Sequence, residues 1–262
     1  MLKTRLIPVL LLKNGQLVRS QAFSVHQVIG NPIQEVQRYN EWTVDELVYL
    51  DISDDDTMTG RTDTKIRQDD SLLGLLDSVA ARCFMPLTFG GRIRTVADMH
   101  ARLSRGADKI TLNTGALRDP GLIGAGAATF GSQAIVVVID AKKRDDGGYE
   151  VMLDHGRTPT GKSVTEWSRE VERLGAGEIM VQSVDRDGRA DGYDIELVRS
   201  VVDVTTIPVI ALGGVGKLEH FADAIVHGGA SAAAAANFFH FVELSDRRAK
   251  RAMAKVGIPV RL

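Results

Sequence analysis

The sequence predicts an α/β fold, a (β/α)8 TIM barrel formed by the whole chain, residues 1–262, as one domain. Short apolar runs alternate eight times with helical patterns, which favours a parallel sheet with helices on its outside. The chain of 262 residues also has the length of a typical barrel of this kind. A doubly wound open sheet is the alternative that the same alternation allows.

The predicted strands are continuous apolar runs, as is typical of strands that are covered on both faces. They are Arg5–Leu12, Glu46–Ile52, Phe84–Phe89, Lys109–Asn113, Ala134–Asp140, Glu178–Ser183, Pro208–Leu212 and Ser231–Ala235. The helical patterns lie at 32–42, 71–82, 96–105, 119–129, 163–174, 194–202, 218–227 and 243–256. Pro32 and Pro120 stand where a first helical turn accepts proline, and Ser163 with Glu166 has the spacing of a capping box.

Two connections are longer than a barrel requires. Ser53–Asp70 is polar and acidic and follows a strand, so we expect a mobile loop at the active-site end, in which Asp54–Asp56 is a solvated acidic run. The segment Arg144–Gly161 contains the alternating piece YEVMLDHG, which predicts a small hairpin over the same face. His155 in this segment is a candidate for substrate contact.

The two halves of the chain, about residues 1–130 and 131–262, contain an internal repeat. FGGRIRT at 89–95 resembles LGGVGKL at 212–218, and ELVYLDI at 46–52 resembles EIMVQSV at 178–184. A similar offset places LIPVLLLKNG over IVVVIDAKKR, so Leu11 stands opposite Asp140. The repeat predicts two half-barrels in which one strand ends in a carboxylate and its counterpart in an apolar side chain.

Each repeated Gly-Gly pair, Gly90-Gly91 and Gly213-Gly214, follows a predicted strand and precedes a helix. Free backbone N–H groups at such a place favour a phosphate, although glycine also serves ordinary turns. Two such sites would bind both ends of an extended anionic substrate. The neighbouring strand ends would complete the two phosphate cups with Asn113-Thr114 and Ala236-Asn237.

Composition excludes several classes of function. A net charge of -2 lacks the basic footprint of a nucleic-acid-binding protein, and no apolar stretch is long enough for membrane insertion. The single cysteine, Cys83, allows no internal disulfide, and no Cys/His cluster has the spacing of metal ligands. The first residues interrupt their apolar run with Pro8 and therefore predict a strand, not a signal peptide. We expect a cytoplasmic protein with no metal and no cofactor, acting on a small molecule or with a protein partner.

Motifs along nearly the whole chain resemble the cyclase-subunit family of imidazole glycerol phosphate synthase. The stretches are RYNEW, DELVYLDI, PLTFGGRIRT, GADKITLNT, FGSQAIVVVIDAKK, EWSREVERLGAGEI, SVDRDGRADGYD, IPVIALGGVG and GIPVRL. The resemblance implies a glutaminase partner that releases ammonia, which passes along the barrel axis to the other face. There it reacts with a bisphosphate ribonucleotide, which is closed and split to give imidazole glycerol phosphate.

The resemblance also implies roles for charged residues at the entrance of the barrel. The ring through which ammonia enters matches Arg5, Glu46, Lys109 and Glu178, and Asp108 matches a position at the glutaminase interface. The alternative is that these charges only stabilise the barrel, as is common at this end of the fold.

The catalytic face departs from the family. Asp140 matches one of two aspartates that act as general acid and base, but the other position is Leu11, which cannot carry a proton. Asp51 and Asp187 match further candidate catalytic positions. The expected substrate-binding residues are Gly90, Gly91, Asn113, Thr114, Gly188, Gly213, Gly214, Ala236, Asn237 and Arg19. Arg19, Arg92, Gln182, Leu212 and Asn237 replace the family's usual residues.

Three functions remain open at this point. The leucine in IPVLLLKNG is similar to a divergent branch that is associated with acetamidino modification of N-acetyl sugars in lipopolysaccharide O-antigen, where ammonia goes to a separate sugar amidotransferase. We expect this function, on a phosphorylated or nucleotide-sugar substrate. The terminal GIPVRL resembles instead the histidine-pathway cyclase, which is the alternative. A scaffold or regulator of the glutaminase without chemistry is the third.

Overall fold

A computed structural model describes residues 3–42, 44–59, 71–241 and 245–262. Part of the loop expected at Ser53–Asp70 and the first residues of the helix expected at 243–256 therefore lie outside the described residues.

Eight parallel strands form a closed barrel, as the alternation predicted. They are β1 (Arg5–Lys13), β4 (Leu47–Asp51), β5 (Leu87–Gly90), β6 (Lys109–Leu112), β7 (Ile135–Lys143), β10 (Glu178–Ser183), β11 (Val209–Leu212) and β12 (Ala232–Ala235). Pairing runs from β10 through β11, β12, β1, β4, β5 and β6 to β7, and β7 pairs with β10. This last pairing closes the sheet and rules out the doubly wound alternative.

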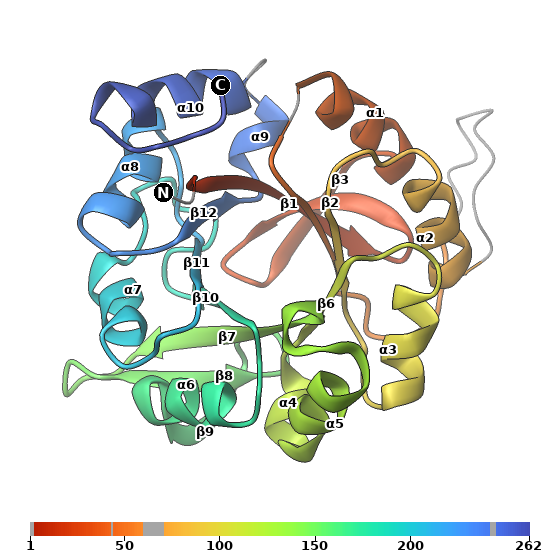
Figure 1. The fold of residues 1–262 in the computed structure, drawn as a ribbon, viewed down its shortest axis with the longest axis horizontal. Coiled ribbons are helices and arrows are strands. Elements are labelled where there is room, and N and C mark those ends of the chain that lie inside the picture. The colour runs from red at the N-terminus through yellow and green to blue at the C-terminus, as the bar shows by residue number, and fades with distance from the viewer. Residues whose placement is uncertain (1–2, 43, 60–70, 242–244) are drawn as a thin grey trace.

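Helices surround the barrel on its outside (Figure 1). They are α1 (Pro32–Trp42), α2 (Leu72–Ala80), α3 (Val96–Leu103), α4 (Thr114–Arg118), α5 (Gly121–Phe130), α6 (Val164–Arg173), α7 (Ile195–Val202), α8 (Leu218–Val226), α9 (Phe238–Phe241) and α10 (Ser245–Lys255), with a 3-10 turn, η1, at Ser132–Ala134. Pro32 begins α1 as expected, whereas Pro120 is the residue before α5 and not part of its first turn. None of the described helices has the length and apolarity needed to cross a membrane.

The capping box predicted at Ser163 and Glu166 is wrong. Ser163 is the last residue of a strand, and its hydroxyl lies 2.9 Å from the Thr165 hydroxyl and caps no helix N–H. A capping box forms instead at the start of α3, between Thr95 and Asp98.

Two antiparallel hairpins extend the barrel at its active-site end. The hairpin of β8 (Tyr149–Leu153) and β9 (Thr158–Ser163) continues β7, as YEVMLDHG predicted. The hairpin of β2 (Gln16–Gln21) and β3 (Val25–Gly30) continues β1 and was not predicted. Its outer strand is largely exposed and has little apolar alternation, so its pattern is that of a loop. The order of elements is the same in both halves of the chain, from a long first strand and hairpin to a short helix after the fourth barrel strand.

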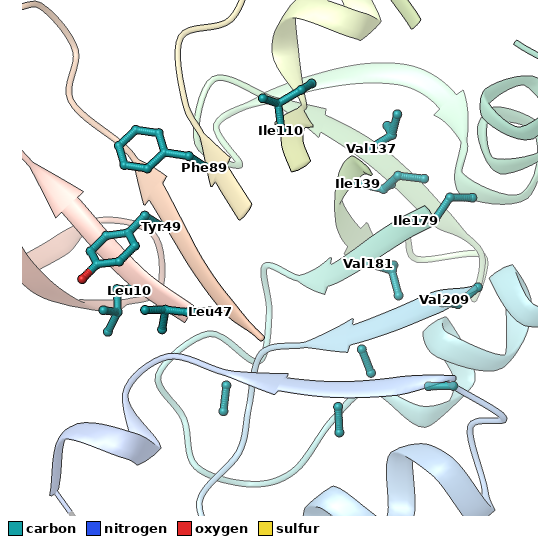
Figure 2. Close-up of a cluster of buried hydrophobic side chains, with 14 of the residues drawn as sticks. Leu10, Leu47, Tyr49, Phe89, Ile110, Val137, Ile139, Ile179, Val181 and Val209 are labelled. Carbon is teal, nitrogen blue, oxygen red and sulfur yellow. The ribbon is translucent and has the colours of Figure 1, made fainter. Parts of the chain in front are cut away.

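Alternate residues of the barrel strands face the helices or the barrel axis, and the apolar residues that face the axis come from β1, β4, β7, β10, β11 and β12. Residues such as Leu10, Tyr49, Val137 and Ile179 point outward to the helices, and Figure 2 shows this outer cluster. Their neighbours face the barrel axis: Ile7, Val9, Leu11, Val48, Val136, Val138, Met180, Ile210, Leu212, Ala232 and Ala234. Burial on both sides is the reason why the strands are continuous apolar runs in the sequence.

Candidate active site

A cavity of about 750 Å³ opens at the carboxyl ends of the barrel strands. Its size is that of small-molecule sites, and its place is where barrel enzymes carry their chemistry. The ends of β1, β4, β7 and β10 and the turns of both hairpins contribute to its wall. The lining residues include Leu11, Asp51, Arg92, Asn113, Asp140 and His155.

Asp140 is a buried carboxylate in the wall of this cavity, with 5% of its surface exposed. Burial raises its pKa to about 6, since the charged form loses its hydration; a hydrogen bond from Asn113 lowers the pKa and the charge of Asp187 adds to the rise. Asn113 Nδ2 donates to Asp140 Oδ2 over 2.8 Å, which orients the carboxylate. A pKa in this range suits a group that both takes and gives a proton near neutral pH.

Leu11 occupies the position equivalent to Asp140 in the other half of the barrel. Leu11 pairs with Leu50 on β4, and Asp140 pairs with Gln182 on β10. Leu50 and Gln182 correspond to each other in the sequence repeat, and all four side chains line the cavity. The structure therefore places an apolar side chain where a second proton-transfer group would stand.

Asp51 lies at the end of β4 and is occupied by neighbouring groups. Its Oδ2 accepts a hydrogen bond from Arg92 Nε at 2.8 Å, and its Oδ1 accepts from the hydroxyl and the backbone N–H of Ser53. With both oxygens engaged, Asp51 holds its neighbours in place and is less available as a base than Asp140.

Asp187 lies beneath the turn of the β2–β3 hairpin. Its Oδ2 accepts hydrogen bonds from the Ser20 hydroxyl at 2.9 Å and from the Phe23 N–H at 3.0 Å. Gly188 lies against the backbone of Ser20 and Gln21. Arg19 is exposed on β2, and its neighbour Ser20 lines the cavity instead, because side chains alternate along a strand.

The first Gly-Gly pair opens onto the large cavity. Gly91, Asn113 and Thr114 line it, while Gly90 is the buried last residue of β5. Gly91 has a φ of +106°, and a side chain there would lie 2.2 Å from the backbone oxygen of Asp51. Only glycine therefore allows this loop to approach the end of β4 so closely.

The second Gly-Gly pair opens onto a much smaller space. Gly213 and Gly214 line a cavity of about 30 Å³ together with Asp187, Gly188, Ala236 and Asn237. Asn237 links this cup to the β2–β3 hairpin, since its Nδ2 donates to the backbone oxygen of Ser20 at 2.6 Å and its Oδ1 accepts from the Ser20 N–H at 3.3 Å. The small cavity has room for about one or two water molecules, so the two cups, although similar in sequence, differ in volume.

At the opposite end of the barrel, four charged side chains form a closed ring. Arg5 pairs with Glu46 at 2.7 Å and with Glu178 at 2.9 Å, and Lys109 pairs with the same two carboxylates at 3.2 and 3.0 Å. The Thr88 hydroxyl also donates to Glu46. The four residues lie at or directly before the amino-terminal ends of different barrel strands, and Glu46 and Glu178 are equivalent positions of the sequence repeat.

The axis between the ring and the cavity is lined by the inner apolar side chains of the strands. Ala232 and Ala234 on β12 are the smallest of them. Asp108, next to the ring residue Lys109, is exposed, and its Oδ2 accepts a hydrogen bond from the Leu87 N–H at 2.8 Å.

Sequence reasoning missed several charged residues of the cavity wall. Arg118 follows the predicted cup Asn113-Thr114 on α4, and its guanidinium pairs with Asp154 at 3.0 Å. Arg157 reaches the wall from the β8–β9 turn. His155, the candidate for substrate contact, lines the same wall, and burial, followed by the charge of Arg157, lowers its pKa. Arg118 and Arg157 could have been found in the sequence from their positions shortly after strand ends. Within the described ranges, no group of three or more His, Cys, Asp or Glu side chains is arranged to hold a metal ion.

Comparison with known proteins agrees with the architecture and the motifs. The family described as "Histidine biosynthesis protein" matches residues 5–245. The imidazole glycerol phosphate synthase subunit HisF of two strains of Caulobacter vibrioides, NA1000 / CB15N and ATCC 19089, is 45% identical over 263 residues, covering 100% of this chain and 97% of theirs. These relatives are named for the synthase and not for sugar modification, so the comparison favours the alternative function over the one we expected first. The chain belongs to the histidine biosynthesis protein family that includes these HisF subunits.

Proposed function

We propose that this chain is the cyclase subunit of an imidazole glycerol phosphate synthase. It takes ammonia from a glutaminase subunit and adds it to a bisphosphate ribonucleotide, which is closed to the imidazole and split. The observation that carries this proposal is Asp140, a buried carboxylate with a pKa of about 6 in a cavity of about 750 Å³. The names of the Caulobacter relatives support the same reaction.

In this proposal Asp140 transfers the protons that ring closure and cleavage require, and Asn113 keeps its carboxylate oriented. The first cup, with Gly91, Asn113 and Thr114, binds one phosphate of the substrate. The second cup binds the other phosphate once the β2–β3 hairpin moves away from Asn237. Asp51 and Asp187 act as positioning residues, because their carboxylates hold Arg92 and the hairpin.

Ammonia enters at the ring of Arg5, Glu46, Lys109 and Glu178. Four ion pairs close this ring, so an ion pair has to open to admit ammonia. Neutral ammonia then crosses the apolar axis above the ring at lower cost than a charged species does. The glutaminase binds at this end, with the exposed carboxylate of Asp108 in its interface.

The test is ammonia-dependent turnover of the bisphosphate ribonucleotide by the purified chain, followed by glutamine-dependent turnover with the glutaminase added. Wild type should turn over in both assays and Asp140→Asn in neither. A wild-type chain that leaves the bisphosphate unchanged at saturating ammonium would contradict the proposal.

Leu11 favours a second candidate function, delivery of ammonia for amidation of an N-acetyl sugar. General acid–base groups contribute about 10²–10⁴ in rate each, and the cavity offers Leu11 where the second would stand. In this case the chain with its glutaminase should support glutamine-dependent amidation by a sugar amidotransferase, even as Asp140→Asn. The same variant separates a scaffold, which would keep its biological effect, from a cyclase.

A further inference from the structure

Arg92 has a backbone conformation that residues with a side chain seldom adopt. It follows Gly91 in the loop after β5 with a φ of +52°, in the left-handed region. Residues of this kind persist where the surroundings hold them, often at binding sites. The side chain of Arg92 is 19% exposed and lines the cavity that contains Asp140.

Two carboxylates hold the guanidinium of Arg92, and they differ sharply in exposure. Asp51, whose side chain is 1% exposed, accepts from Nε at 2.8 Å and fixes the guanidinium from inside the protein. Asp56, whose side chain is 99% exposed, accepts a hydrogen bond from Nη1. The buried partner orients Arg92, whereas the exposed partner is surrounded by water and is easily replaced.

The remaining donors of Arg92 suit an anion with several oxygens. Its hydrogen bonds to the described residues use two of five N–H donors, and the planar fork of a guanidinium matches phosphate oxygens. Arg94, Arg118 and Arg157 line the same cavity. A phosphate dianion carries more charge than the single carboxylate of Asp56 and is favoured in its place.

We propose that Arg92 is a specificity-determining residue that binds a phosphate of the substrate, and that Asp56 occupies the position of a phosphate oxygen until the ligand displaces it. This inference rests on the proposed function for the nature of the substrate. It adds a side-chain cation to a cup otherwise made of backbone and of Asn113 and Thr114. Asp51 is then the residue that positions this cation.

Titration calorimetry of the purified chain with inorganic phosphate and with ribose 5-phosphate tests the inference at low salt. Arg92→Gln should weaken binding by about tenfold or more, the usual effect of losing a hydrogen-bonded charge. Asp56→Asn should tighten binding by about twofold to fivefold, because it removes a competing anion. In the double variant the gain from Asp56→Asn should vanish, since the competition acts only through Arg92.

The controls separate binding from folding. Arg92→Gly removes the strain of the left-handed backbone and should also bind phosphate more weakly. Circular dichroism of both variants shows whether a loss of affinity in Arg92→Gln comes from misfolding. Arg105→Gln, on the outside of the barrel beside Asp77, should bind phosphate as wild type does.

Phosphate affinity within twofold of wild type in both Arg92 variants, or weaker binding in Asp56→Asn, would overturn the inference. The measurement needs neither ammonia nor turnover. If the chain does not catalyse the cyclase reaction but the Arg92 variants still bind phosphate more weakly than wild type, only the proposed function is contradicted.

Discussion

Asp140→Asn should remove ammonia-dependent turnover and at the same time raise the free energy of unfolding. Burial raises the pKa of Asp140 from 3.8 to about 6, so the ionised carboxylate is disfavoured in the folded state. At about 1.4 kcal/mol for each pKa unit, the ionised group costs the folded state at most about 3 kcal/mol at pH 7. Asparagine is uncharged, has a similar shape and still offers a carbonyl oxygen to Asn113 Nδ2.

The gain in stability should depend on pH in one direction. Since the pKa of Asp140 is higher in the folded than in the unfolded chain, its contribution to stability is fully present below its unfolded pKa, near 3.8, and is lost as the pH rises through 6. The difference between Asp140→Asn and wild type should therefore be small near pH 4, grow between pH 4 and 6, and level off above. Wild-type turnover should rise over the same interval if the ionised carboxylate acts as base.

Urea unfolding followed by circular dichroism at several pH values between about 4 and 8 measures this difference. Asp203→Asn, at the exposed end of α7, is the matched control and should show no such pH-dependent gain. A variant that is no more stable than wild type at pH 7, or a gain that is constant with pH, would refute the assignment of the raised pKa to burial of Asp140.

Three further predictions concern the ring, the second cup and Leu11. Glu46→Gln breaks two of the four ion pairs of the ring and should lower the yield of product per glutamine hydrolysed while turnover with added ammonium is kept; equal losses in both assays would speak against a gate. Asn237→Ala removes both hydrogen bonds to Ser20 and should lower the free energy of unfolding by about 1–2 kcal/mol. Hydrogen exchange of the Ser20 amide should become faster; an unchanged exchange rate would show that Asn237 does not hold the hairpin. Leu11→Asp puts a carboxylate at a site with 8% exposure and should lower the melting temperature, with turnover changed by less than about tenfold if Asp140 suffices; a hundredfold rise would favour the second candidate function.

Much of the barrel was predictable, because its features are local or repeated in the sequence. Each barrel strand is buried on both faces, which makes it a continuous apolar run, and turn glycines such as Gly91 mark the strand ends. The repeat placed Leu11 opposite Asp140, and the strand register agrees with that alignment. The β2–β3 hairpin was missed, since its exposed outer strand is stabilised by pairing and by Asp187, not by an apolar pattern of its own.

The sequence by itself determined the barrel, its two halves and the residue types at each strand end, because these follow from burial and periodicity along the chain. Only the tertiary structure decided which groups are free to act. Asp51, Asp140 and Asp187 are all aspartates in or after barrel strands, yet Asp51 is engaged by Arg92 and Asp187 by the hairpin, while burial raises the pKa of Asp140. The second glycine cup is likewise linked to the β2–β3 hairpin by Asn237, whose partner Ser20 lies more than 200 residues away in sequence. Such contacts depend on where the closed barrel brings distant segments together, and no local pattern encodes them.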